Sequence, residues 1–126
     1  MILESVFTAL TEQKGWGVFT KEAIPADTLI EVSPVVVMSA KEKVLLDQTR
    51  LHDYIFHWQD EECCMATGLV PVYNHSPLSN CEYFQDYENG TISIRSVREI
   101  APGEELCINY NGDFNNSDPV WFELSD

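Results

Sequence analysis

The sequence predicts a mainly β domain built from many short strands and one or two short helices. Short runs of β-branched residues are separated by glycine, proline and asparagine turn signals, which is the pattern of all-β domains. The alternation of strands with long helices that parallel-sheet nucleotide folds require is absent, as are repeats. With 126 residues, 44% hydrophobic and 22% charged, the chain has the size and composition of one globular domain.

The first strands are expected before residue 40. Residues 6–19 contain Gly15 and Gly17, and they are typical of a strand, a glycine-marked turn and the start of a second strand. Residues 29–39 are rich in β-branched side chains but include Pro34, which has no backbone N–H for a sheet ladder. We therefore expect this segment to be an edge strand or two short strands.

A short helix is expected next. Ser39 and Glu42 have the spacing of a capping box, in which each side chain bonds the backbone of the other residue, and the helix should run through Asp47. Residues 54–58 are aromatic and strand-like, and 60–62 mark a turn. Residues 65–74 are apolar but contain Gly68 and Pro71, so this stretch is expected to be irregular or a single helical turn.

Two strands close the pattern. Residues 91–95 alternate between apolar and polar side chains, and Asn89-Gly90 just before them is a strong hairpin signal. Residues 101–104 form a predicted turn that leads into a strand over 106–110. In that strand Leu106, Ile108 and Tyr110 share one face.

The charge balance restricts the partners. Seven basic against 21 acidic residues give a net charge of -14, which repels phosphate backbones and anionic membranes and attracts cations. A basic protein tail is the favoured partner, although acidity that only keeps a small protein soluble explains the charge equally well. No basic leader with an apolar core, and no run near ~20 apolar residues, is present. We therefore expect a cytoplasmic or nuclear protein that is not secreted.

The cysteines do not predict a metal site. They form no CxxC pair, and adjacent strand residues point to opposite faces, so Cys63 and Cys64 are poorly placed to share an ion even with His52 and His57 nearby. In a reducing compartment all of them are expected to be free thiols. The four are Cys63, Cys64, Cys81 and Cys107.

The triplet Asn74-His75-Ser76 allows three interpretations. It fits a glycosylation acceptor, it could supply a catalytic or metal-binding histidine, or its asparagine could be the functional residue. Glycosylation requires secretion, and residues 89–91 and 115–117 fit the same acceptor pattern by chance. The acceptor interpretation is therefore disfavoured.

Three short motifs follow one another along the chain: Gly15-Trp16-Gly17, residues 74–76 and residues 103–110. Each is weak alone, because glycines around an aromatic usually mark a bulge and a strand tyrosine usually packs in a core. The first motif does not match a dinucleotide-binding fingerprint, because it lacks the third glycine that opens a helix in that fingerprint.

In this order and at this spacing the chain resembles the SET domain of protein-lysine methyltransferases. Residues 15–19 look like the family's glycine motif, 54–56 its tyrosine-containing strand, 74–76 with Asn80 its central motif, and 105–110 its terminal tyrosine motif. Residues 21–27 and 98–105 resemble family turns. The resemblance covers about residues 4–114.

The resemblance implies a fold of several small sheets around a pseudoknot-like threaded C-terminal segment. Residues 1–126 would be a single SET domain, with a core of about 4–114 and a tail, 115–126, that closes the site. S-adenosylmethionine would bind on one face and a substrate lysine on the other, joined by a narrow channel. The chain looks like minimal members of bacteria and large viruses, without zinc-binding flanks.

The resemblance also implies residue roles. Tyr110 and Tyr54 would be catalytic, although packing in the core is an equally good reading of Tyr54. His75 would contribute mainly its backbone to the adenine. Tyr54, Ile108 and Tyr110 would line the lysine channel. The cofactor would contact Lys14, Gly15, Trp16, Gly17, Asn74, His75, Tyr110, Phe114 and Trp121.

Several expectations concern function. Methyl transfer needs an aligned, deprotonated lysine, against an ordinary pKa of about 10.4. Ile108 stands where the family often has Phe or Tyr, which predicts methylation beyond the monomethyl state. Pro77 to Asn80 and Asn109 depart from the family pattern, so cofactor affinity is in question. A catalytically silent module that binds a basic peptide or the cofactor is the alternative, and a homodimer would complete the surface of so short a chain.

Overall fold

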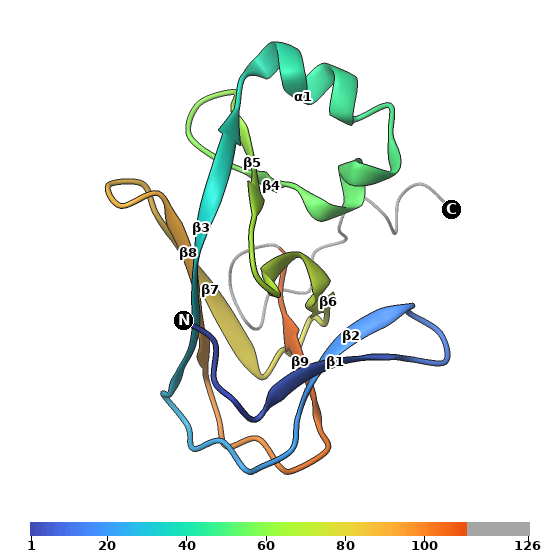
Figure 1. The fold of residues 1–126 in the computed structure, drawn as a ribbon, viewed down its shortest axis with the longest axis vertical. Coiled ribbons are helices and arrows are strands. Elements are labelled where there is room, and N and C mark those ends of the chain that lie inside the picture. The colour runs from blue at the N-terminus through green and yellow to red at the C-terminus, as the bar shows by residue number, and fades with distance from the viewer. Residues whose placement is uncertain (111–126) are drawn as a thin grey trace.

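The computed structural model describes residues 1–110, which form two curled sheets with one α-helix and two 3-10 helices (Figure 1). The four-stranded sheet has the order β1-β2-β9-β6, and the five-stranded sheet β4-β5-β3-β8-β7. The strands are β1 (Val6–Leu10), β2 (Trp16–Thr20), β3 (Leu29–Met38), β4 (Phe56–His57), β5 (Cys63–Ala66), β6 (Asn74–His75), β7 (Cys81–Asp86), β8 (Thr91–Ser96) and β9 (Glu105–Ile108). The mainly β prediction is confirmed.

Strand β9 holds the smaller sheet together. It pairs antiparallel with β2 on one side and parallel with β6 on the other, where Asn74 lies opposite Cys107 and His75 opposite Ile108. The chain after β8 therefore passes between two segments that precede it in sequence. This threading brings the central and terminal motifs side by side.

The prediction for residues 29–39 is wrong in one respect. β3 is one continuous ten-residue strand in the middle of the larger sheet rather than an edge. It tolerates Pro34 because the strand changes partner there: residues up to Pro34 pair with β8, and residues from Val35 onward pair with β5. The carbonyl of Pro34 still accepts a bond from the Thr67 N–H at 3.0 Å.

The helix prediction is confirmed. α1 (Ala40–Leu46) begins after the N-cap Ser39, both bonds of the capping box with Glu42 are present, and Asp47 is the C-cap. By contrast, residues 50–54 form a 3-10 helix, η1 (Arg50–Tyr54), so Tyr54 ends a helix instead of lying on the predicted strand. The predicted helical turn within 65–74 is η2 (Val70–Val72).

The hairpin signal is also confirmed. β7 and β8 pair antiparallel from Cys81 opposite Ser96 to Asp86 opposite Thr91, and Gly90 has a φ of 67° in the turn. β7 has no counterpart among the predicted strands, because it lies at the sheet edge and its alternate residues are only partly buried.

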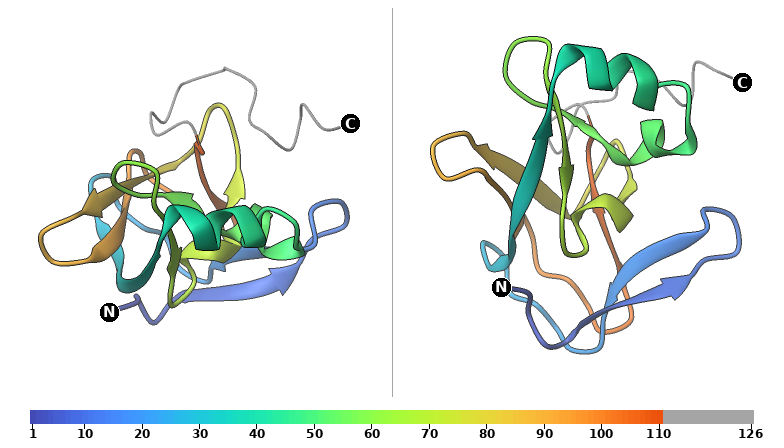
Figure 2. Two further views of the ribbon diagram at one scale, coloured as in Figure 1. Left: turned by 90° about the horizontal axis from the view of Figure 1, so that it is seen from above. Right: turned by 45° about the horizontal axis from the view of Figure 1, so that its top comes forward.

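The core lies between the two sheets. Aliphatic side chains from both are fully buried, among them Val18, Ile30, Ile92, Ile94, Leu106 and Ile108. α1 lies at one end of the molecule with η1 beside it, the turn of the β1–β2 hairpin projects to one side, and η2 and β6 lie between η1 and the hairpin (Figure 1, Figure 2). Within residues 1–110 no helix is long and apolar enough to cross a membrane.

Candidate active site

Two pockets meet at Tyr110. The first, here the hairpin pocket, has a volume of about 720 Å³ and lies between the β1–β2 turn, η1, η2 and β6. The second, here the helix pocket, has a volume of about 370 Å³ and is lined from α1, η1, β4 and β7. Among the described residues, Tyr110 alone lines both pockets.

Tyr110 is held at three points. Its hydroxyl donates to the Tyr73 carbonyl at 2.7 Å, and its backbone N–H donates to Nδ1 of His75 at 3.1 Å. Its ring lies 5.2 Å from the His75 ring and 6.4 Å from the Phe56 ring, centroid to centroid. Burial raises the pKa of the Tyr110 phenol well above its usual value. The phenol is therefore a neutral, oriented hydroxyl at neutral pH.

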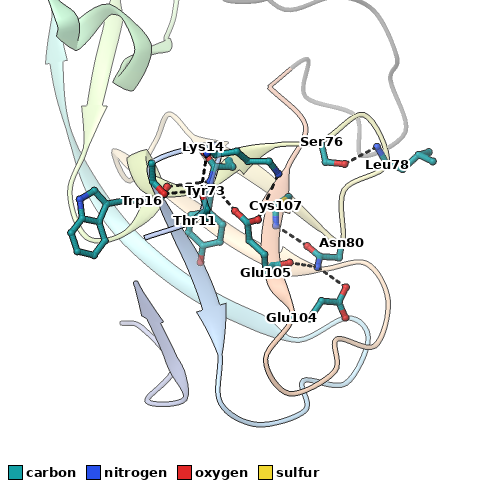
Figure 3. A network of polar contacts seen from close by, with 12 residues as sticks. Thr11, Lys14, Trp16, Tyr73, Ser76, Leu78, Asn80, Glu104, Glu105 and Cys107 are labelled. Carbon is teal, nitrogen blue, oxygen red and sulfur yellow. Dashed lines mark hydrogen bonds and ion pairs between the residues drawn. The ribbon is translucent and has the colours of Figure 1, made fainter. Parts of the chain in front are cut away.

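Glu105 does not line the hairpin pocket itself, but it bonds two residues that do, Asn74 and Lys14. Asn74 Nδ2 donates to Glu105 Oε2 at 2.8 Å and to the Trp16 carbonyl at 3.1 Å. The ammonium of Lys14 lies 3.6 Å from Glu105 Oε1, and Figure 3 shows the two side chains pointing toward each other. Asn74, Lys14 and Trp16, all predicted cofactor contacts, thus come together here, whereas Glu105 was not among the predicted site residues.

The two glycines of the first motif are required for different structural reasons: Gly15 for its backbone conformation and Gly17 for lack of space. Gly15 has a φ of 73° in a turn closed by Thr11, whose N–H and hydroxyl both donate to the Gly15 carbonyl, at 2.7 and 2.8 Å. A Cβ on Gly15 would meet nothing within 4 Å, so the pocket is open beside it. A Cβ on Gly17 would lie 2.7 Å from Glu105 Oε2 and 3.1 Å from Asn74 Nδ2, so only glycine fits against that pair.

His75 contributes its side chain as well as its backbone. The backbone pairs with β9, and the ring nitrogen Nδ1 accepts from the Tyr110 N–H. The resemblance implies mainly the backbone role. The ring adds a second one: it braces the residue that the two pockets share.

The predicted channel residues are distributed unevenly. Tyr54 exposes 46% of its surface and lines the hairpin pocket, so it does not pack in the core. Ile108 is fully buried and lines neither pocket. Two further predicted cofactor contacts, Phe114 and Trp121, lie outside the described residues.

The floor of the helix pocket is aromatic, and its residues were not predicted. Phe56 and Tyr83 meet edge to face with ring centroids 5.2 Å apart, and the Tyr83 hydroxyl donates to the Tyr110 carbonyl at 3.3 Å. Phe56 lies within the tyrosine-containing segment of the resemblance, and Tyr83 follows Asn80 of the central motif by three positions. Their closeness in sequence to these two motifs could have identified Phe56 and Tyr83 as site residues.

The rim of the helix pocket is polar. Asp47 accepts from Lys43 Nζ at 2.8 Å, and its other oxygen lies 2.8 Å from Nδ1 of His52. The hydrogen bond from Lys43, followed by that from His52, holds the pKa of Asp47 below its usual value. Among residues 1–110 no group of three or more His, Cys, Asp or Glu is placed to hold a metal ion.

The loop that departs from the family pattern closes onto β9. Asn80 accepts from the Cys107 N–H at 2.8 Å and donates to the Glu105 carbonyl at 2.8 Å (Figure 3). The Asn109 side chain donates to the Pro77 carbonyl at 3.4 Å. The unusual Pro77 and Asn109 therefore contact each other, and the loop is compatible with the threaded strand.

Comparisons with known proteins agree with this geometry. The family described as SET domain matches residues 15–111. The chain is 41% identical to the histone H3 lysine-37 specific histone-lysine N-methyltransferase of Schizosaccharomyces pombe, over 90% of this chain and 74% of that protein. It is 34% identical to the histone H3 lysine-36 specific enzyme of Cryptococcus neoformans, over 86% of this chain and only 14% of that protein.

A solved structure supports the same fold. A Plasmodium falciparum protein assigned as a histone methyltransferase superposes with a TM-score of 0.66 at 20% identity, over 96% of this chain and 99% of that one. The motifs, the threaded β9, the two pockets that share a tyrosine, and the sequence relatives all point the same way. The chain belongs to the SET domain family and is a protein-lysine methyltransferase.

Proposed function

We propose that this protein transfers a methyl group from S-adenosylmethionine to the side-chain amine of a lysine in a basic protein tail, with histone H3 as the first candidate. The observation that carries the proposal is Tyr110, which lines both pockets. A donor in the hairpin pocket and an acceptor amine entering through the helix pocket would meet beside one hydroxyl.

The hairpin pocket fits the cofactor. Its volume of about 720 Å³ lies within the range of small-molecule sites. Lys14 would hold the carboxylate of the cofactor, and Asn74, oriented by its bond to Glu105, would hold the amino group, while Trp16, 56% exposed, offers an apolar surface. When bound, S-adenosylmethionine supplies an electrophilic methyl group on a sulfonium.

The residues of the chain would orient the amine and keep it neutral. The Tyr110 hydroxyl donates its hydrogen bond to the Tyr73 carbonyl, so its oxygen is left to accept a hydrogen bond from the N–H of the incoming amine. The aromatic rings of Phe56 and Tyr83 exclude water, and a desolvated site lowers the pKa of a lysine. Alignment by fixed groups is worth orders of magnitude in rate.

The substrate class follows from charge and from relatives. A net charge of -14 attracts a cationic tail, and this attraction weakens as salt rises. The relatives of Schizosaccharomyces pombe and Cryptococcus neoformans are specific for lysines of histone H3. We propose the same substrate here. We also propose that the protein is cytoplasmic or nuclear, and its free, buried cysteine thiols support this localisation.

We also propose that methylation proceeds beyond the monomethyl state. Ile108 lies outside both pockets and has no hydroxyl with which to order a water near the amine, and the Tyr83 hydroxyl is directed to the Tyr110 carbonyl. Mass spectrometry of a histone H3 peptide at exhaustive turnover should show di- or trimethyl-lysine. A product that stops at monomethyl-lysine would contradict this part of the proposal.

The central test compares the unaltered protein with Tyr110→Phe, using labelled S-adenosylmethionine and a panel of basic proteins that includes histone H3. Loss of the hydroxyl should lower kcat by roughly 100-fold, because the amine loses its orienting acceptor. Tyr87→Phe is the matched control, since Tyr87 lies outside both pockets and should leave kcat unchanged.

Two other results would change the assignment. Cofactor binding without transfer by the unaltered protein would favour a silent module that binds a basic peptide. Equal transfer by both proteins would remove Tyr110 from the mechanism. Light scattering on the same samples tests the proposed homodimer, which a monomeric mass at all concentrations would reject.

A further inference from the structure

A fully buried glutamate lies behind the hairpin pocket. Glu31 on β3 has no exposed surface, and its carboxyl oxygens accept three hydrogen bonds. The donors are the Ser33 hydroxyl at 2.6 Å, the Leu69 N–H at 2.8 Å and the Tyr73 hydroxyl at 3.4 Å. Among the described residues no lysine or arginine forms a salt bridge with Glu31. Burying a carboxyl group is costly unless it is hydrogen-bonded, so these three bonds offset that cost and fix the positions of their donors.

The backbone is shaped to fit over this carboxyl group. Gly68 has a φ of 67°, and a Cβ at that position would collide with Glu31 Oε2 and with the Ser33 hydroxyl. The chain can therefore pass so close to Glu31 only as glycine, and in a conformation that other residues rarely adopt. The contact between β3 and the segment after β5 is tightly defined.

The segment that Glu31 holds forms part of the active site. Its bonds to Leu69 and Tyr73 bracket η2, so both ends of residues 69–73 are tied to one side chain. Within that segment Pro71 and Val72 line the hairpin pocket, and Asn74, the residue directly after the segment, lines it too. Glu31 therefore acts on a wall of the pocket without lining it.

The same segment supplies the acceptor for the catalytic hydroxyl. The Tyr73 side chain, 1% exposed, points to Glu31, whereas the Tyr73 carbonyl accepts from the Tyr110 hydroxyl at 2.7 Å. A shift of Tyr73 would move the proton acceptor of Tyr110. Displacements of about 1 Å in an aligned site cost up to roughly 100-fold in rate.

We propose that Glu31 is a positioning residue that sets the orientation of the Tyr110 hydroxyl through Tyr73. The proposal rests on the proposed function for its effect on rate, but its structural part, the coupling of Glu31 to Tyr110, can be measured without turnover. A mere anchor of the fold would change stability and leave the environment of Tyr110 unaltered once the protein is folded.

The first experiment uses the full chain labelled with 3-fluorotyrosine. The fluorine resonance of Tyr110 is assigned by its absence in Tyr110→Phe. Glu31→Leu removes every acceptor and should shift this resonance. Glu31→Gln keeps one oxygen for Leu69 and Ser33 and an amide for the Tyr73 hydroxyl, so its resonance should stay close to that of the unaltered protein.

Two further variants keep the test decisive. Tyr73→Phe removes only the hydrogen bond between Tyr73 and Glu31. It should shift the Tyr110 fluorine resonance even if Glu31→Leu does not fold. Ser96→Ala is the matched control: Ser96 is 1% exposed and bonds the Thr28 N–H at 2.9 Å, remote from both pockets. It should lower stability and leave the resonance unchanged. An unshifted resonance in Tyr73→Phe and in any folded Glu31→Leu would overturn the proposal.

Kinetics separate positioning from binding. Tyr73→Phe should lower kcat about tenfold, with the KM for a histone H3 peptide and the Kd for S-adenosylmethionine within about twofold of the unaltered protein. In a Tyr110→Phe background, single-turnover rates should show a much smaller effect, because coupled residues are not additive. The same tenfold loss in both backgrounds would contradict the proposal.

Absence of methyl transfer by the unaltered protein would instead reject the proposed function, while the resonance shift would still decide the role of Glu31.

Discussion

Gly17 lies where β2 passes closest to the Asn74–Glu105 pair. Replacement by alanine would place a Cβ 2.7 Å from Glu105 Oε2, the oxygen to which Asn74 donates, while Lys14 lies beside the other oxygen, Oε1. The carboxylate must move, and the bond that orients Asn74 is lost. We expect Gly17→Ala to weaken S-adenosylmethionine binding by about tenfold, or about 1.4 kcal/mol, measured by titration calorimetry.

Gly103→Ala provides the control for that measurement. Gly103 has a φ of 83° but nothing within 4 Å of an added Cβ, and it lies outside both pockets. The substitution should lower the melting temperature through backbone strain and leave the Kd for the cofactor unchanged. An unaltered Kd in Gly17→Ala would show that Glu105 does not hold Asn74 in its binding orientation.

At the level of single residues, the motifs identify several residues that the fold brings to the pockets. Asn74, Lys14 and Trp16, which stay predictions as cofactor contacts, line the hairpin pocket, and Tyr110 lines both pockets. Glu105 was not predicted, because a glutamate that follows another glutamate at the start of a strand is usually an ordinary solvated residue. Its role follows from Asn74, 31 positions away, and only the pairing of β6 with β9 brings them together.

At the level of elements, the loop before β7 depends on one side chain. Asn80 is 3% exposed, and its amide bonds the Cys107 N–H and the Glu105 carbonyl, each at 2.8 Å. Asn80→Ala would leave both groups of β9 without these partners. We expect a loss of about 2–4 kcal/mol in the free energy of unfolding, measured by urea denaturation.

Leu78 offers a comparison within the same loop. Its side chain is 78% exposed, so Leu78→Ala should change the free energy of unfolding by less than about 0.5 kcal/mol. A similar small change in Asn80→Ala would mean that β9 is held by its strand pairing alone.

Elements were predictable where their cause is local. The capping box of α1 and the Asn89-Gly90 hairpin involve neighbours in sequence, and both are found. β3 was not correctly predicted. A proline interrupts a strand only where a neighbouring strand would need a hydrogen bond from the missing N–H. Whether it does depends on β5 and β8, which exchange as partners at that residue.

For the molecule as a whole, buried thiols and phenols determine the alkaline limit of stability. Burial raises the pKa of Cys107 to about 11 and that of Cys64 to about 12, from an ordinary value of 9.0, and raises the pKa of Tyr73 and Tyr110 as well. Since the folded-state pKa exceeds the unfolded one, stability is full below about pH 9 and falls as pH rises toward 11–12.

The expected loss is substantial. Cys107 alone should account for about 2 kcal/mol of unfolding free energy between pH 9 and 11. Denaturation in urea with a reducing agent, repeated at intervals from pH 8 to 11, measures the slope, and Cys107→Ala should make it shallower. A free energy that stays constant to pH 11 would show that these thiols ionise equally well in the folded protein.

The position of β9 has a consequence for how the molecule is made. Its partners β2 and β6 are synthesised long before it, and β6 has two residues and no other partner in its sheet. On a ribosome, the chain up to residue 104 would have a β1–β2 hairpin but no platform for Asn74 and no tyrosine between the pockets. Binding of the proposed cofactor would thus begin only after β9 has left the exit tunnel and paired with β2 and β6. The pairing of β9 and the pocket wall that it supports would form in one step, so that chains ending before β9 would lack the proposed S-adenosylmethionine site.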